Sequence, residues 1–121
     1  VERLLCDVRA GRLGVPGVPH GVGSVGPSMV ADEASQYYSP VAVDNGSSPV
    51  ATMASAHGGA AIPNSLGVEY HSYELGWWAD LVEEDVIVDG YIEIPEKPGL
   101  GVTLDMDAVE DHMVDGETLF D

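Results

Sequence analysis

The chain has 121 residues, with 21 acidic residues against four lysines and arginines and a formal net charge of −17. A surface this acidic repels nucleic acid, and no apolar run is long enough to span a membrane. With 45% hydrophobic residues, the chain is too apolar to be an acidic disordered tail. We therefore expect one folded cytoplasmic domain that has neither nucleic-acid nor membrane partners.

The acidic excess indicates adaptation to a salt-rich, halophilic cytoplasm. At about 1 M salt the screening length falls to about 3 Å, which removes most of the repulsion between surface charges. An ordinary acidic protein is the alternative. The single cysteine, Cys6, excludes an internal disulfide.

Residues 1–28 differ in composition from the remainder. They hold two acidic residues, Glu2 and Asp7, whereas residues 29–121 hold the other 19 and a single basic residue, Lys97. The segment is rich in glycine, valine and proline and has no helical or alternating period. It predicts an unstructured or foreign leader, either a flexible segment or the translation of a disrupted reading frame, before a domain that spans 29–121.

Two motif matches predict structure rather than ligand binding. Residues 21–26 read GVGSVG, a dinucleotide-binding pattern, but Pro16 and Pro19 should disrupt the strand that such a site needs. Residues 85–96 resemble a calcium loop, but Ile87 stands where an oxygen ligand is required. The sequence VIVDGYIEI within it predicts instead two alternating strands joined by an Asp-Gly turn.

From residue 29 onward the apolar pattern predicts regular elements. The stretch MVADEASQYY is typical of the end of an amphipathic helix. Its apolar face would contain Val30, Ala34 and Tyr37 or Tyr38, with Asp32 and Glu33 opposite. A short buried strand is then predicted at residues 41–43.

The next helix and strand complete a βαβ unit. Ser48 suits the N-cap and Pro49 the first helical position, and the helix should stop at Pro63. Its expected apolar face consists of Val50, Met53, Ala54 and Ala61. The stretch LGVEY, residues 66–70, predicts the second strand, which should run parallel to the first with both carboxyl ends at one edge.

Polar residues follow both predicted strands at that edge, where parallel sheets bind their ligands. Asp44 ends the first strand and Glu69 lies near the end of the second, so two carboxylates should lie together. An inward-pointing glutamate is costly to bury without a partner, metal or substrate, although a solvated acid is the alternative. His71 could share the face of Glu69, whereas His57 is interpreted as a packing residue of the helix.

The remaining elements are short. An apolar patch on a short acidic helix, Trp77, Trp78, Leu81 and Val82, indicates core or interface packing rather than cofactor stacking. After the predicted hairpin, PEKPGLG predicts a rigid turn-rich loop. Asp105 and Asp107 suit the start of a last short helix, AVEDHM.

Three stretches, AIPNSLGVEYH, WWADLV and DGYIEIPEKPGLGV, resemble the C-terminal end of the enolase superfamily, in particular the sugar-acid dehydratases of the mandelate racemase-like group. The resemblance covers residues 29–121. It implies an α/β fold, a (β/α)7β TIM-like barrel with an N-terminal capping domain. This chain would hold the last two barrel strands with their helices, the C-terminal hairpin and the short helix that returns to the cap.

The resemblance also implies roles for the residues at the sheet edge. Glu69 matches the glutamate that ends the eighth strand and hydrogen-bonds the substrate carboxylate. Asp44 falls where the family has a general acid–base histidine, which an aspartate cannot simply replace because it is shorter and much more acidic. Asn45 and His71 are the expected substrate-binding residues. The magnesium ligands of the family lie on its third to fifth strands, to which no part of this chain corresponds.

The implied chemistry is loss of water from a small sugar acid, of the gluconate, xylonate or galactonate type, through a magnesium-stabilised enediolate. The parent enzyme would be a homo-oligomer, and this chain an incomplete and inactive fragment of it. The alternative is a non-enzymatic protein. It would be either a truncated remnant or a small acidic module that binds a partner through Trp77 and Trp78.

Overall fold

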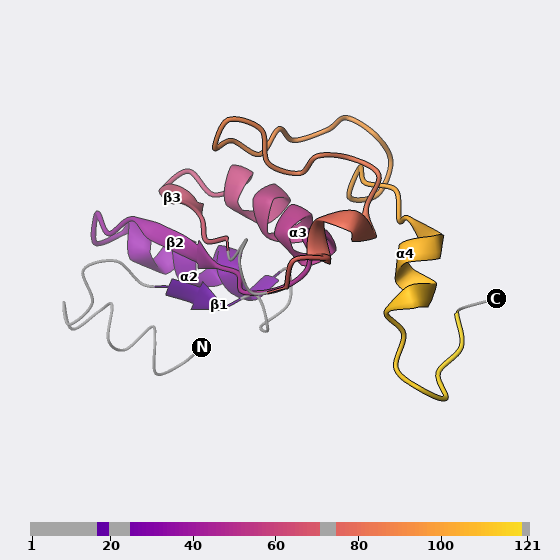
Figure 1. Cartoon of the computed structure of the whole chain (residues 1–121). Coiled ribbons are helices and arrows are strands. Elements are labelled where there is room, and N and C mark those ends of the chain that lie inside the picture. The colour runs from indigo at the N-terminus through magenta and orange to yellow at the C-terminus, as the bar shows by residue number, and fades with distance from the viewer. Residues whose placement is uncertain (1–16, 20–24, 71–74, 120–121) are drawn as a thin grey trace.

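The centre of the computed structural model is a parallel sheet of three short strands (Figure 1). The structure describes residues 17–19, 25–70 and 75–119. The strands follow in chain order across the sheet as β1 (Gly17–Pro19), β2 (Val41–Asp44) and β3 (Ser65–Val68). Two helices connect them, α2 (Val25–Ser35) and α3 (Pro49–Ala60). The expected α/β architecture and the parallel pairing of the two predicted strands are confirmed.

The expected leader is structured in part, which corrects the sequence interpretation. Strand β1 lies within residues 1–28 and pairs in parallel with β2, placing Val18 opposite Val43. Helix α2 begins at Val25 and crosses the expected boundary at residue 28. Pro19 is compatible with a strand because it is the last residue of an edge strand, where the missing N–H breaks no ladder. Residues 1–16 and 20–24, and with them most of the GVGSVG motif, lie outside the described residues.

Helix α3 begins where the sequence predicts, but it buries a different face. Ser48 is the N-cap, and its hydroxyl oxygen accepts a hydrogen bond from the backbone N–H of Ala51 at 3.5 Å. Met53 is buried as expected, whereas Ala54 and Ala61 are exposed. The buried residues of α3 are Pro49, Thr52, Met53, Ser55, Ala56 and Gly59.

Gly59 explains why the buried face of α3 consists mainly of small residues. A Cβ atom at this position would lie 3.3 Å from Cγ2 of Val68 and 3.5 Å from Cγ2 of Val43. The helix therefore approaches the sheet closely at Gly59, where only a small residue fits. A search for large apolar residues at helical spacing cannot detect a face of this kind.

Both helices cover the same face of the sheet. Parallel crossovers are right-handed almost without exception, and the two crossovers step across the sheet in the same direction. The core residues are Val30, Ala31, Ala34, Val41, Val43, Met53, Ala56, Ile62 and Val82. Tyr37 or Tyr38 was expected on the apolar face of α2, but both are exposed because the helix ends at Ser35.

No helix covers the opposite face of the sheet in the described part of the chain. Ala42 and Asp44 are half-buried, whereas Leu66 and Gly67 are exposed, the leucine by 65%. A shift of register between Val41 and Ala42 leaves Leu66 without a Cα partner in β2, as in a β-bulge. This second face of the sheet is therefore open.

The predicted Asp-Gly turn forms, but the strands expected on either side of it do not. Val88 and Tyr91 exchange two backbone hydrogen bonds of 2.9 Å. Asp89 and Gly90 between them have φ values of 52° and 82°, the left-handed conformations of a type I′ turn. The antiparallel pairing in this segment is limited to that one bridge. Both bridged side chains are exposed, so no apolar layer supports a longer hairpin.

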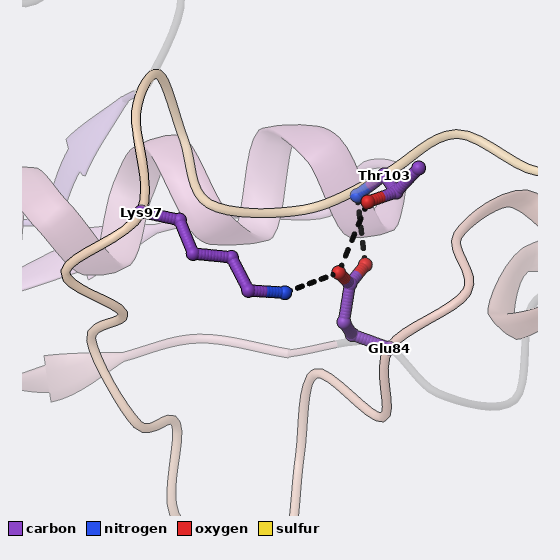
Figure 2. Close-up of polar contacts among 3 residues, drawn as sticks. All are labelled: Glu84, Lys97 and Thr103. Carbon is purple, nitrogen blue, oxygen red and sulfur yellow. Dashed lines mark hydrogen bonds and ion pairs between the residues drawn. The ribbon is translucent and has the colours of Figure 1, made fainter.

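The loop PEKPGLG is fastened to the rest of the chain by Glu84 (Figure 2). The Glu84 carboxylate accepts hydrogen bonds from the backbone N–H of Thr103 at 2.7 Å, the Thr103 hydroxyl at 3.1 Å and Nζ of Lys97 at 2.9 Å. These contacts lower the pKa of Glu84 from 4.5 to about 2, and the backbone hydrogen bond from Thr103 is the largest cause.

The C-terminal elements lie to one side of the sheet, with α4 (Met106–Asp111) farthest from β1 in the view of Figure 1. As predicted, Asp105 caps this helix, and its side chain accepts a hydrogen bond from the backbone N–H of Ala108 at 3.0 Å.

The predicted tryptophan helix is a single 3-10 turn, η2 (Trp78–Leu81). Within the predicted patch only Val82 is buried, while Trp77, Trp78 and Leu81 are half-buried.

Candidate functional site at the carboxyl edge of the sheet

Two carboxylates lie at the carboxyl ends of neighbouring parallel strands. Asp44 is the last residue of β2, and Glu69 follows β3 directly. The backbone N–H of Glu69 donates a hydrogen bond of 2.9 Å to the carbonyl of Val43, which continues the pairing of the strands past the end of β3. The fold therefore brings together the two acids that the sequence placed at one edge.

Asp44 and Glu69 line the same hollow on the open face of the sheet. This open-face cavity has a volume of about 400 Å³ and is lined by Ala42, Asp44, Leu66, Gly67, Val68 and Glu69. Asp44 is half-buried and Glu69 is exposed. The lining includes two small residues, Ala42 and Gly67, beside the two acids.

The described lining of the cavity contains two acidic residues and no basic one. Lys97 is the only lysine or arginine in the described part of the chain, and it pairs with Glu84 instead of with either acid of the cavity. A carboxylate accepts hydrogen bonds when ionised and can donate one when protonated. The pair can therefore bind hydroxyl groups and accept or return a proton.

Asn45 has a different position from the one expected of a substrate-binding residue. Its side chain is fully buried, and it is not among the residues that line the cavity. Nδ2 donates hydrogen bonds to the hydroxyl oxygen of Thr52 at 2.8 Å and to the carbonyl of Glu69 at 3.3 Å. The structure thus gives Asn45 two contacts within the protein, and its direct contact with a substrate remains a prediction.

The two histidines considered from the sequence have separate outcomes. His71 lies outside the described residues, so its expected place beside Glu69 remains a prediction. His57 is half-buried on α3, and its Nε2 lies 3.1 Å from the carbonyl of Leu100. This contact holds the loop PEKPGLG, which contains Leu100, against α3. His57 is therefore a packing residue of the helix, as the sequence interpretation expected.

The described residues do not provide a metal centre. Within residues 17–19, 25–70 and 75–119, no three histidine, cysteine, aspartate or glutamate side chains lie together in a way that could hold a metal ion. The same residues contain no helix that is long and apolar enough to cross a membrane.

Trp77 is used within the chain. Its ring stacks on the imidazole of His112 with a centroid distance of 4.0 Å and an interplanar angle of 18°. The stack joins the start of η2 to the end of α4. This contact is consistent with the packing role predicted for the tryptophans.

Thr52 is the residue of this region that the sequence did not indicate. It is fully buried on α3 and is the partner of Asn45. The local pattern that points to Thr52 is a threonine in the first turn of a helix that follows a strand ending at Asp44 and then Asn45. This pattern identifies Thr52 as a partner of Asn45 only when the helix is known to pack on the end of that strand.

A parallel sheet with helices on one face and acids at its carboxyl edge is the arrangement of barrel enzymes, which bind their ligands at that edge. The model of the Enolase C-terminal domain-like family matches residues 12–108, and the chain belongs to that family. The match begins inside the segment that was expected to be foreign.

Individual relatives of this chain are also enzymes or enzyme-like proteins of this kind. The chain is 60% identical over 121 residues to a D-xylonate dehydratase from Haloferax volcanii, an alignment that covers 99% of this chain and 29% of the relative. A mandelate racemase/muconate lactonizing enzyme-like protein from Rubrobacter xylanophilus DSM 9941 matches with a TM-score of 0.74 and 38% identity, over 82% of this chain and 26% of that one.

A third comparison is an enolase of the mandelate racemase subgroup from Agrobacterium tumefaciens. It matches with a TM-score of 0.70 and 29% identity, over 86% of this chain and 29% of that one. This chain thus spans less than a third of the length of these relatives. The expected C-terminal fragment of the enolase fold is confirmed. The open face of the sheet is explained as well, because in a closed barrel that face points to the interior.

Proposed function

We propose that this chain forms part of the active site of an acid-sugar dehydratase of the gluconate, xylonate or galactonate type. The observation that carries the proposal is the convergence of Asp44 and Glu69 on one cavity at the carboxyl edge of adjacent parallel strands. The 60% identity to a D-xylonate dehydratase supports the substrate class. Because the chain spans 29% of that relative, the activity is proposed for the larger enzyme.

Dehydration of a sugar acid removes the proton from the carbon next to the carboxylate and expels the hydroxyl of the following carbon as water. Both transfers need a side chain that accepts or donates a proton at the reacting atom. We assign this role to Asp44, which accepts the proton as a carboxylate and returns it to the leaving hydroxyl as a carboxyl. Its side chain is shorter than that of a histidine, which makes it a weaker catalyst here.

Glu69 is assigned to the substrate carboxylate. In its protonated form it donates a hydrogen bond to an oxygen on which negative charge accumulates as the neighbouring carbon loses its proton. His71 is proposed as a further substrate contact two residues along the chain.

Magnesium is expected in the parent enzyme, but the described residues of this chain do not fit it, because they include no cluster of three metal-binding side chains. We therefore assign no step carried by these residues to a metal ion. The net charge of −17 supports a salt-adapted cytoplasmic setting for the enzyme.

A chimeric enzyme tests the proposal. The aligned 29% of the Haloferax volcanii D-xylonate dehydratase is replaced by this chain, and the dehydration of D-xylonate is measured at high salt. Glu69→Gln should lower kcat by roughly 10²–10³-fold, the usual cost of losing one group that stabilises developing charge.

Glu83→Gln is the matched control in the same chimera, because Glu83 is exposed and does not line the open-face cavity. It should leave kcat unchanged. Equal turnover of the Glu69→Gln and Glu83→Gln chimeras would show that the cavity is not the active site.

A further inference from the structure

Asn45 joins the ends of three elements through one buried amide. It follows β2, donates a hydrogen bond to the carbonyl of Glu69 after β3 at 3.3 Å, and donates another to the hydroxyl oxygen of Thr52 on α3 at 2.8 Å. That hydroxyl in turn donates to the carbonyl of Ser48 at 3.1 Å. The carboxyl ends of β2 and β3 are therefore tied to the first turn of α3.

These bonds fix the backbone of both acidic residues. Asn45 is the direct chain neighbour of Asp44. On the other strand, the N–H of Glu69 is held by the carbonyl of Val43 at 2.9 Å, and its C=O is held by Asn45. Adjacent residues of an extended chain point to opposite sides, so Asn45 lies in the helix layer while the two carboxylates line the cavity.

We propose that Asn45 is a positioning residue that fixes the separation and direction of the Asp44 and Glu69 side chains without touching the substrate. The inference rests on the proposed function, since that function gives the two carboxylates their task. The Oδ1 atom of Asn45 is buried and has no hydrogen-bond partner within the described residues. A buried acceptor without a partner lowers the stability of the fold. The stabilising contribution of this amide is therefore the two hydrogen bonds that Nδ2 donates.

The first test compares two asparagines of the same chain. Asn45→Asp keeps the size of the side chain and removes both donor bonds. The matched control is Asn64→Asp, because Nδ2 of Asn64 also donates to two carbonyls, those of Ala31 at 3.2 Å and Ser39 at 2.9 Å. Its Oδ1 is likewise buried without a partner, yet it precedes β3 and lies at the opposite edge of the sheet.

Amide hydrogen exchange and the side-chain carboxyl ¹³C resonances of the 121-residue chain are the readouts. Asn45→Asp should speed exchange of the Glu69 amide on the order of tenfold and shift the carboxyl resonances of Asp44 and Glu69. Asn64→Asp should leave these signals unchanged and instead speed exchange of the Val41 amide, which is bonded to the carbonyl of Asn64. Equal effects of both variants at Glu69, or no effect of Asn45→Asp, would overturn the proposal.

Thr52 provides a second pair of variants in case Asn45→Asp does not fold. Thr52→Val removes the hydroxyl that accepts from Asn45, and it should reproduce the faster exchange at Glu69. Thr52→Ser keeps the hydroxyl and should behave as the unchanged chain does. If the serine variant is as perturbed as the valine variant, the effect does not depend on the Thr52 hydroxyl, and the hydrogen-bonded positioning role fails.

The chimeric dehydratase separates this inference from the proposed function. Asn45→Asp should lower kcat at least about tenfold with little change in KM, and more than Asn64→Asp does at an equal unfolding temperature. If Glu69→Gln has no effect on turnover while the exchange results hold, the proposed function fails and the tie made by Asn45 stands. If Glu69→Gln lowers turnover but Asn45→Asp does not, the positioning role is wrong.

Discussion

Glu84 and Thr103 are joined by two hydrogen bonds to one carboxylate, although 19 positions separate them in the sequence. The shorter one, 2.7 Å, comes from the Thr103 backbone N–H, and the Thr103 hydroxyl supplies the other at 3.1 Å. Hydrogen bonds to the ionised form of a carboxylate favour that form, which is the reason for the low pKa of Glu84. The contact anchors the segment that leads to α4.

Acid should therefore release this anchor over a defined range of pH. The pKa of Glu84 falls from 4.5 to about 2 on folding, so its stabilising effect is complete above pH 4.5 and is lost as the pH falls toward 2. A titration of the Glu84 carboxyl and Thr103 amide resonances should show a common transition near pH 2. Glu84→Gln should abolish that pH dependence, whereas Glu93→Gln, an exposed acid outside the contact, should keep it. A Glu84 transition near pH 4.5 would contradict the prediction.

Gly101 should tolerate no side chain. It has a φ of 76°, and a Cβ atom there would overlap Cγ of Pro95. Gly99→Ala is the control, because Gly99 has a similar φ of 69° but nothing within 4 Å of its position for Cβ. Both variants place a non-glycine residue at a positive φ and carry the same kind of backbone strain. The free energy of unfolding of Gly101→Ala should therefore be lower than that of Gly99→Ala by about 1–3 kcal/mol, the cost of overpacking. Equal urea midpoints would show that the loop relaxes away from Pro95.

Helix α4 should depend on the Trp77–His112 stack. With six residues it is too short to be stable alone, and a stacked aromatic pair contributes about 0.5–1.5 kcal/mol. His112→Ala should increase amide exchange at Val109 while the Val41 amide in the sheet stays protected. Asp111→Ala, next to His112 in the chain and exposed, is the control. Unchanged exchange at Val109 in the His112 variant would sink this prediction.

The fold should depend on salt because of the net charge of −17. Repulsion among the acids opposes the compact state at low ionic strength, and it is largely screened at about 3 M potassium chloride. Far-ultraviolet circular dichroism should show helical structure there and its loss at about 0.1 M. A folded spectrum that does not change between these conditions would refute the prediction.

The isolated chain should not dehydrate D-xylonate, gluconate or galactonate, with or without magnesium. We expect two deficits to act together: the described residues contain no cluster that could hold the metal, and the family resemblance implies that Asp44 replaces the family histidine. Asp44→His should therefore leave the isolated chain inactive. In the chimera the same change should raise turnover, but by less than the roughly 10²–10⁴-fold that general acid–base catalysis contributes, because Asp44 already supplies part of it. Chelator-sensitive dehydration by the isolated chain would contradict this.

The sequence by itself determined the elements whose signals are local. Ser48 and Pro49 set the start of α3, Asp105 set the start of α4, and Asp89-Gly90 set the I′ turn. In each case one or two residues satisfy the backbone groups or the dihedral angles of a single turn, with no contribution from distant contacts. The same local signals placed Asp44 and Glu69 at one edge, because a βαβ unit leaves both carboxyl ends there.

Only the tertiary structure decided the features that depend on which surfaces meet. Strand β1 has three residues, too few for a period, and it is a strand because β2 offers it a partner. The buried face of α3 became visible only through the close approach at Gly59. Asn45 could be assigned its bonds to Thr52 and Glu69 only after the strand ends and the helix had been packed together, since nothing local determines the partner of a buried amide.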